Sequence, residues 1–157
     1  MIEIERKFLV LDDTYKQQAR ERTLIKQGFL NTAPERTVRV RLKGEKGYLT
    51  IKGPGTTDGT TRFELEYDIP PGEAEALLRL CEPGIIEKLR YEVPAGEHLW
   101  EVDEFLGENQ GLVVAEIELD AADETFEKPT WLGEEVTGLP RYYNSQISKT
   151  PYIKWKK

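Results

Sequence analysis

Charged and apolar residues alternate along most of this chain. Side chains on a strand point alternately to opposite faces, so this alternation predicts strands with one apolar and one charged face. In the opening stretch IEIERKFLV, Glu3, Glu5 and Lys7 share one face, whereas Ile4 and Phe8 share the other. Most of the strand-like stretches are bounded by turn residues. They are Ile2–Val10, Thr37–Leu42, Tyr48–Lys52, Thr61–Ile69, Ile86–Val93, Leu99–Phe105 and Leu112–Leu119.

Helical periodicity is confined to short stretches. Gly72–Cys81 follows two prolines, places its apolar residues at helical spacing and carries acidic residues in its first turn, where the helix dipole favours them. We expect a short helix over Ala121–Phe126, and a turn or two of helix in each of Thr14–Arg22 and Tyr143–Ser148. No repeat or linker divides the sequence, so we expect a single domain over residues 1–157, of β-rich α+β class.

The charged faces of the expected strands carry pairs of residues with the same sign. These pairs are Glu3/Glu5, Arg39/Arg41, Glu64/Glu66, Lys88/Arg90 and Glu116/Glu118. For any one strand, a simply solvated face is an adequate explanation. Solvated faces usually mix signs, however, and like charges on one face of a sheet destabilise it by a few tenths of a kcal/mol. Repetition of this cost on strand after strand indicates a ligand that compensates the charges.

A closed barrel would bring these charges together. Closure of about eight antiparallel strands removes exposed edges and can direct the charged faces inward. The lumen would then hold the cations Lys7, Arg39, Arg41, Lys52, Lys88 and Arg90 and the acids Glu3, Glu5, Glu64, Glu66, Asp103, Glu116 and Glu118. The apolar faces would point outward, beneath helices such as Gly72–Cys81 or a partner subunit. The sequence therefore predicts an eight-stranded antiparallel barrel with a charged lumen and outer helices, and a homodimer would suit its apolar exterior.

The two sets of lumen charges suggest a ligand with two components. Clustered cations suit an anionic chain, and clustered carboxylates suit hard metal ions that take oxygen ligands. A polyphosphate of charge about −5 with two divalent ions would leave the site near neutrality. A phosphate chain bridged by Mg²⁺ is the class of ligand that fits.

Composition excludes several other classes of protein. The net charge of −7 argues against a general nucleic-acid binder. Cys81 is the only cysteine, which excludes an intrachain disulfide and a cysteine-based zinc site. The acidic start is unlike a signal peptide, and no apolar run reaches membrane-spanning length. We therefore expect a cytoplasmic protein with no membrane partner.

The order of the charged motifs resembles the CYTH, or triphosphate tunnel metalloenzyme, superfamily. Glu3-Ile4-Glu5-Arg6-Lys7 matches its E-x-E-x-K signature. The resemblance continues in order through Arg39-Val40-Arg41, Thr50-Ile51-Lys52, Glu64-Leu65-Glu66, Lys88-Leu89-Arg90, Asp103, Glu116-Ile117-Glu118, Gly133–Thr137 and Arg141–Asn144. It implies an eight-stranded antiparallel tunnel that binds triphosphates with Mg²⁺ or Mn²⁺. The short bacterial members that it most resembles are inorganic triphosphatases.

Roles for the lumen residues follow as hypotheses from this resemblance. Lys7, Arg39, Arg41, Lys52, Lys88 and Arg90 would bind phosphate oxygens and neutralise charge in the transition state. Glu116 and Glu118 would anchor one metal, and Glu3 and Glu5, with Asp103, a second that activates the attacking water. Glu64 and Glu66 would be supporting acids. We expect the catalytic effect to depend most on Glu3, Glu5, Arg39 and Lys52.

One position departs from the family pattern. Relatives often read Q-G-Y-L where this chain has Gln27-Gly28-Phe29-Leu30, so a phenol proposed as acid or base is absent. We expect that proton transfer to be dispensable, since a metal can lower the pKa of water without it. The alternatives left open are a nucleoside or thiamine triphosphatase, a class IV-type adenylyl cyclase, and a polyphosphate-binding module without catalysis.

Overall fold

The chain folds into strands with these bounds: β1 Ile2–Val10, β2 Glu21–Asn31, β3 Thr37–Lys43, β4 Lys46–Gly55, β5 Thr61–Ile69, β6 Ile86–Ala95, β7 His98–Phe105, β8 Val113–Glu118 and β9 Leu132–Glu135.

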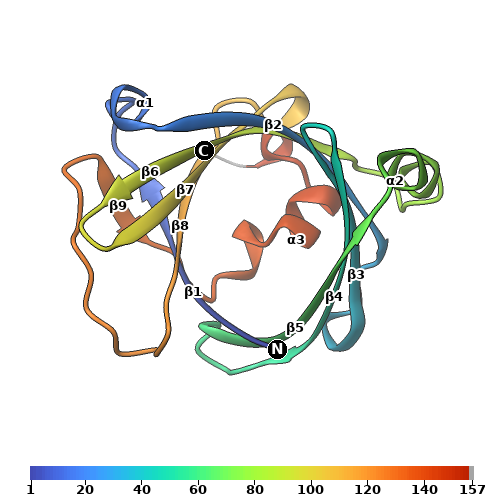
Figure 1. Ribbon diagram of the computed structural model, residues 1–157, viewed down its shortest axis with the longest axis horizontal. Helices are drawn as coiled ribbons and strands as arrows, with labels where there is room; N and C mark the ends of the chain where they lie inside the picture. The colour runs from blue at the N-terminus through green and yellow to red at the C-terminus, as the bar shows by residue number, and fades with distance from the viewer. Residues whose placement is uncertain (156–157) are drawn as a thin grey trace.

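Strand β1 closes a barrel because it pairs along both of its edges. In the computed structural model, which describes residues 1–155, its residues Glu5–Leu9 pair with β8, and Ile2–Ile4 pair with β5 on the other edge. The strand order β5-β4-β3-β2-β6-β7-β8-β1 therefore returns to β5, and every pairing is antiparallel. Figure 1 shows the resulting ring of eight strands.

The short β9 pairs with β1 beyond the barrel seam and extends the sheet. All seven predicted strands are present. Strands β2 and β9 were not predicted, because Leu24-Ile25 and Gly28 interrupt the alternation in β2 and β9 has only four residues.

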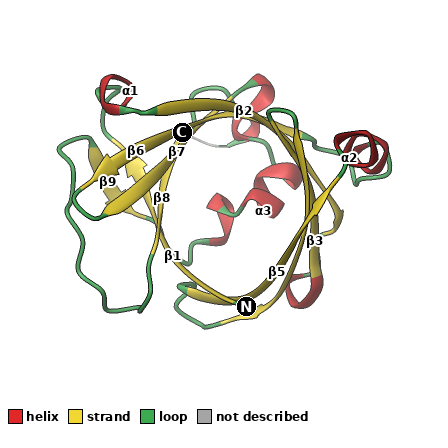
Figure 2. Ribbon diagram, viewed as in Figure 1, coloured by secondary structure: helices red, strands yellow, loops and turns green. Residues whose placement is uncertain are grey.

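The helical elements are all short, and Figure 2 shows them in red. They are α1 Tyr15–Gln18, α2 Pro71–Leu78, α3 Asn144–Lys149, and the 3₁₀ turns η1 Pro34–Arg36, η2 Gly107–Asn109, η3 Pro140–Tyr142 and η4 Tyr152–Lys154. Helix was correctly expected around α1, α2 and α3. It was wrong for residues 121–126, which form a bend and turn over 121–123 followed by irregular chain. There the Glu124 carboxylate accepts a hydrogen bond from the Asp120 backbone N–H and pairs with His98.

The outer face of the barrel is apolar and is covered in two places by the chain itself. Helix α2 packs Ala74 and Leu78 against Val40 of β3. Across the molecule, α1 and the segment that leads into β9 bury Trp100 of β7 and Trp131, whose rings meet edge to face at 5.8 Å. Because the apolar side chains of a strand pack beneath this outer cover, the alternate side chains face the lumen.

Helix α3 differs from the other helices because it lies inside the outline of the ring when the barrel is viewed along its axis (Figures 1 and 2). Its Ile147 is buried with Phe29 and Phe105. The chain leading to it passes Gly138, which approaches Gly59 at the tip of the β4–β5 hairpin. A Cβ atom added to Gly59 would lie 2.4 Å from the Gly138 Cα, and both glycines have positive φ. The prediction of outer helices thus holds for α1 and α2, whereas α3 reaches into the barrel.

No helix among residues 1–155 is both long enough and apolar enough to cross a membrane.

Candidate active site in the barrel lumen

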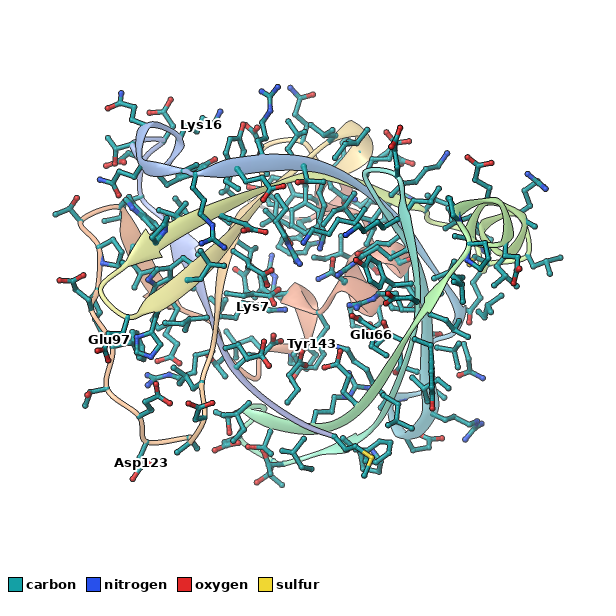
Figure 3. The ribbon with its side chains drawn as sticks, viewed as in Figure 1. Lys7, Lys16, Glu66, Glu97, Asp123 and Tyr143 are labelled. Atoms are coloured by element: carbon teal, nitrogen blue, oxygen red, sulfur yellow. The ribbon has the colours of Figure 1, made fainter. Side chains whose placement is uncertain are left out.

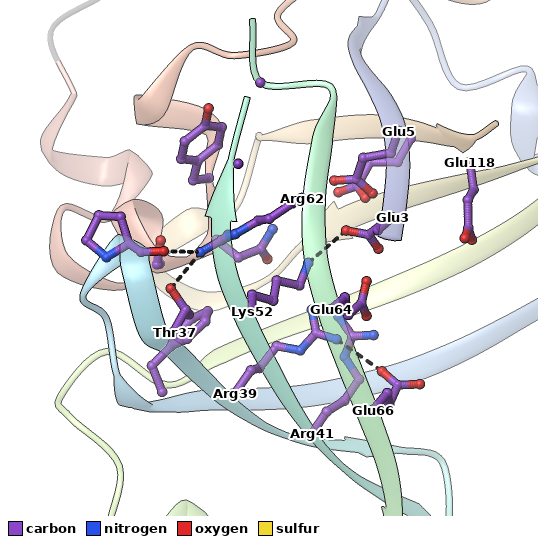
Figure 4. A pocket seen from close by; sticks show the side chains of 18 of the residues that line it. Glu3, Glu5, Thr37, Arg39, Arg41, Lys52, Arg62, Glu64, Glu66 and Glu118 are labelled. Carbon is purple, nitrogen blue, oxygen red and sulfur yellow. Dashed lines mark hydrogen bonds and ion pairs between the residues drawn. The ribbon is translucent and has the colours of Figure 1, made fainter. Parts of the chain in front are cut away.

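The barrel encloses a cavity of about 520 Å³ that is lined by charged side chains. Most of the predicted site residues contribute to its wall, namely Glu3, Glu5, Arg39, Arg41, Lys52, Glu64, Glu66, Lys88, Arg90, Glu116 and Glu118. Figure 4 shows several of them, carried by separate strands and directed toward one another. In Figure 3, Lys7, Glu66 and Tyr143 lie inside the ring, whereas Lys16, Glu97 and Asp123 lie outside it. Charges far apart in the sequence therefore share one interior space.

Arg39 and Lys52 stand on the paired strands β3 and β4. A terminal nitrogen of Arg39 donates to the Thr50 hydroxyl at 3.2 Å and lies 3.5 Å from a Glu66 carboxylate oxygen. Its Nε is buried and has no hydrogen-bond partner in the described part of the chain. The Lys52 ammonium lies 3.2 Å from a Glu3 carboxylate oxygen on β1. Arg39 thus keeps a buried donor available, which is expensive unless a ligand accepts from it.

Arg41 is neutralised by no carboxylate. Its Nε donates to the Gln27 amide oxygen at 2.9 Å, and no acidic group of residues 1–155 forms an ion pair with it. Burial, and then the nearby charges of Arg39 and Arg90, lower the pKa of Arg41 to about 9. An anion in the cavity would therefore find a strongly attractive guanidinium at this place.

Lys88 and Arg90 of β6 converge on Asp103 of β7. Arg90 donates to both Asp103 carboxylate oxygens, at 2.8 and 2.9 Å, and the Lys88 ammonium lies 2.7 Å from one of them. Burial opposes ionisation of Asp103, but Arg90 and Lys88 outweigh it and hold its pKa far below the ordinary value. Asp103 is 2% exposed and does not line the cavity. This placement differs from the metal-ligand role expected for it, because both of its oxygens already hold cations.

The acids line the other part of the wall, on the neighbouring strands β7, β8, β1 and β5. Glu5 is the cross-strand partner of Glu118, and Glu116 is the partner of Glu101. Burial, followed by the charges of Glu116 and Glu3, raises the pKa of Glu5 well above its usual value. The pKa of Glu118 is also raised, first by burial and then by Glu3 and Glu101. These carboxyls repel one another, and a hard cation shared between them would relieve that repulsion.

Glu116 is the exception among these acids, because Lys7 compensates it. The Lys7 ammonium lies 3.7 Å from Glu116 and donates to the Tyr142 carbonyl at 3.0 Å. Burial opposes the charge of Glu116, but Lys7, helped by Arg90 and Lys88, lowers its pKa to about 2. Lys7 itself is 7% exposed and does not line the cavity. It contacts the segment that leads into α3, and its charge favours the ionised form of Glu116.

Sequence reasoning missed several residues in or beside the lumen wall. Arg62 lines it and is fixed by hydrogen bonds to the Gly53 and Pro34 carbonyls and to the Thr37 hydroxyl. Its position on the same face of β5 as Glu64 and Glu66 was a usable signal. Gln27 belongs to the unpredicted strand β2, and Glu101, Tyr143 and Asn144 are further lining residues that were not predicted. Phe29, the departure noted above, also lines the cavity.

Known proteins share both this sequence and this architecture. Residues 1–151 match the CYTH domain family. The chain belongs to the CYTH family. An inorganic triphosphatase of Acetivibrio thermocellus is 52% identical over 155 residues, covering 98% of this chain and 97% of that protein. An inorganic triphosphatase of Nitrosomonas europaea is 35% identical over 153 residues, covering 94% and 97%. The family resemblance seen in the sequence is therefore confirmed.

The fold of a CYTH protein is confirmed as well. A crystal structure of an inorganic triphosphatase superposes with a TM-score of 0.65 at 32% identity, covering 93% of this chain and 97% of that one. Triphosphatases of the CYTH family depend on a metal ion. Which ion this chain uses belongs to the proposal below.

Proposed function

We propose that this CYTH protein hydrolyses inorganic triphosphate to pyrophosphate and phosphate, using Mg²⁺ or Mn²⁺. The observation that carries the proposal is the lumen itself, in which a cationic wall on β4, β3 and β6 and an acidic wall on β7, β8, β1 and β5 enclose one cavity. Relatives at 52% and 35% identity that bear the name inorganic triphosphatase support the choice of substrate.

The cationic wall would bind the phosphate chain. Arg39 offers a buried Nε without a partner, and Arg41 offers a guanidinium without a carboxylate. Arginine suits bidentate contact with phosphate oxygens, whereas Lys52 and Lys88 act as point charges. As the terminal phosphate is transferred to water, negative charge grows on the departing pyrophosphate oxygen, and these fixed cations neutralise it.

The acidic wall fits a hard divalent cation by its donor chemistry. Glu3, Glu5 and Glu118 have raised pKa values, each chiefly because of burial and with neighbouring carboxylates adding to it. Among residues 1–155, no three acidic, histidine or cysteine side chains form a ready-made metal site, so oxygens of the triphosphate would complete the coordination. When bound, a divalent metal supplies charge neutralisation and lowers the pKa of the attacking water.

Two of the predicted roles are adjusted to the geometry. Asp103 and Lys7 act behind the wall: Asp103 holds Lys88 and Arg90 in place, and Lys7 keeps Glu116 ionised. Glu66 serves Arg39 in the same way, and Glu64 stays a supporting acid of the wall. Phe29 lies opposite Arg39 in the β2–β3 register and has no titratable group, so turnover proceeds without a phenol at this position.

Phosphate release from several substrates tests this proposal. Purified protein with Mg²⁺, and separately with Mn²⁺, is given inorganic triphosphate, ATP, thiamine triphosphate or long-chain polyphosphate. The proposal requires inorganic triphosphate to show the highest kcat/KM. Faster hydrolysis of ATP or thiamine triphosphate would favour a nucleoside or thiamine triphosphatase instead, and formation of cyclic AMP would favour an adenylyl cyclase. Tight binding of triphosphate without turnover would favour a polyphosphate-binding module. The cytoplasmic location, the single domain over 1–157 and the homodimer stay predictions.

A further inference from the structure

Two neutral amides join three of the lumen cations, Arg41, Lys88 and Arg90, into one hydrogen-bonded chain. The Arg41 Nε donates to the Gln27 Oε1 at 2.9 Å, and the Gln27 Nε2 donates to the Asn144 Oδ1 at 2.8 Å. The same Asn144 oxygen accepts from the Lys88 ammonium at 2.9 Å. Lys88 continues to Asp103 at 2.7 Å, and Asp103 to Arg90. The chain therefore runs from β3 through β2 and α3 to β6 and β7.

The orientation of both amides is determined by this chain. Two donors meet at the Asn144 Oδ1, so a flipped Asn144 would turn its NH₂ group toward them. Gln27 must present its oxygen to Arg41, which can only donate, and its nitrogen to Asn144. Gln27 and Lys88 are fully buried, so each of these bonds is costly to lose.

The lumen cations differ in what holds them. Lys52 lies against Glu3, Arg39 near Glu66, Lys88 and Arg90 against Asp103, and Lys7 near Glu116. Of the six predicted cations, only Arg41 has no carboxylate partner in residues 1–155, and an amide takes that place. Arg62, which also lines the cavity without a carboxylate partner, is held instead by two backbone carbonyls and the Thr37 hydroxyl. A carboxylate would orient the guanidinium equally well but would cancel the charge that attracts an anion.

The amide contact also leaves part of Arg41 available. Gln27 occupies the Nε, and the two terminal nitrogens make no hydrogen bond to another residue of the described chain, although Arg41 lines the cavity. Those two nitrogens form the edge of the guanidinium that grips phosphate oxygens. In the same way, Asp103 and Asn144 take two of the three protons of the Lys88 ammonium and leave one for the cavity.

From this geometry we propose that Gln27 and Asn144 are positioning residues: their neutral amides hold Arg41 and Lys88 in the lumen wall while leaving the charge of Arg41 uncompensated for a triphosphate. The inference rests on the proposed function. It also explains why α3 reaches into the barrel, since its first residue, Asn144, supplies the junction of the chain.

Three variants test the proposal, with KM for inorganic triphosphate and the thermal unfolding midpoint as readouts. Gln27→Met removes the amide at similar size, and Gln27→Glu restores an acceptor for Arg41 but adds a negative charge. The matched control is Gln18→Met, which removes a glutamine that accepts a hydrogen bond from the Trp131 ring nitrogen outside the lumen. We expect Gln27→Met to raise KM at least fivefold, Gln27→Glu to regain the midpoint but keep a high KM, and Gln18→Met to leave KM unchanged.

The double variant Gln27→Met/Arg41→Ala shows whether Gln27 acts through Arg41. Its KM should equal that of Arg41→Ala within twofold, because the amide then has no guanidinium to hold. The proposal is overturned if the effects of the two substitutions multiply, if Gln27→Met changes the midpoint without changing KM, or if Gln27→Glu restores both.

Failure of the proposed function can be told apart from failure of this inference. If the wild-type protein releases no phosphate, the proposed function falls, and calorimetric titration of the same variants with inorganic triphosphate replaces KM by Kd. A wild-type protein that does not bind triphosphate at all overturns both.

Discussion

Glu5 of β1 stands directly across from Glu118 of β8, and both carboxyls face the lumen. Side chains at such positions lie about 5 Å apart, where like charges destabilise a sheet. Burial is the larger reason that the pKa of Glu5 is raised, and Glu116 and Glu3 add to it. Ionisation of these carboxyls therefore costs folding stability, and a bound cation would relieve the repulsion.

We predict that Glu5→Gln stabilises the protein while abolishing turnover. The folded-state pKa of Glu5 is above its unfolded value, so ionisation of Glu5 costs stability as the pH rises above about 4.5. The gain from Glu5→Gln should therefore be larger at pH 8 than at pH 5, with a melting temperature higher by roughly 2 to 4 °C at pH 8. Thermal unfolding without metal measures this, and a lower melting temperature at pH 8 would contradict the account.

Arg39 and its exposed neighbour Arg36 provide a matched pair for the cationic wall. Arg39 is 8% exposed and faces the cavity, whereas Arg36 pairs with Glu35 on the surface. We expect Arg39→Ala to raise KM and lower kcat together, with a loss in kcat/KM of about a hundredfold or more, comparable to the loss of one fixed transition-state donor. Arg36→Ala should leave both constants unchanged in the same phosphate-release assay. Equal effects of the two substitutions would remove Arg39 from the site.

Substitution of Asp103 distinguishes a role in positioning Lys88 and Arg90 from a role in binding metal. Because it is buried between Arg90 and Lys88, Asp103→Asn leaves two buried cations with a neutral partner and should lower the free energy of unfolding by about 3 kcal/mol. The KM for triphosphate should rise, while the metal concentration that gives half-maximal rate stays the same. A large increase in that metal concentration would return Asp103 to the metal ligands.

Outside the lumen, the Arg6–Glu135 ion pair joins β1 to β9. Arg6 donates to both carboxylate oxygens of Glu135, at 2.8 and 2.7 Å, which lowers the pKa of Glu135. A lowered folded-state pKa stabilises the protein above pH 4.5, and this contribution is lost as the pH falls through the folded value. Glu135→Gln should cost about 0.5 to 1 kcal/mol at pH 7, since the pair is partly exposed, and much less below pH 4. Denaturant unfolding at the two pH values checks this, and a pH-independent difference would contradict it.

The strands and the ionic lumen residues could be read from the sequence because each depends on local alternation. The pairs Arg39/Arg41 and Glu116/Glu118 can be recognised in the sequence by their like charges at a spacing of two residues. Closure of the barrel then brings these pairs together. Gln27 could not be found in this way, because it is uncharged and β2 does not alternate cleanly.

The contacts of the C-terminal segment also could not be predicted from local sequence patterns. Asn144 reaches the site only through the tertiary placement of α3, and the bond from Gln27 to Asn144 spans 117 positions of sequence. The role of Asp103 likewise depends on tertiary contacts. The alternation shows that Asp103 faces inward, but it does not show that Arg90 and Lys88 occupy both of its carboxylate oxygens.

The most direct test of the central claim is a ³¹P NMR time course of inorganic triphosphate with the wild-type protein and Mg²⁺. The account predicts equal amounts of phosphate and pyrophosphate, no reaction when a chelator removes the metal, and at most residual reaction with Lys52→Ala. A triphosphate signal that stays unchanged with the wild-type protein and metal, or a rate unaffected by Lys52→Ala, would contradict it.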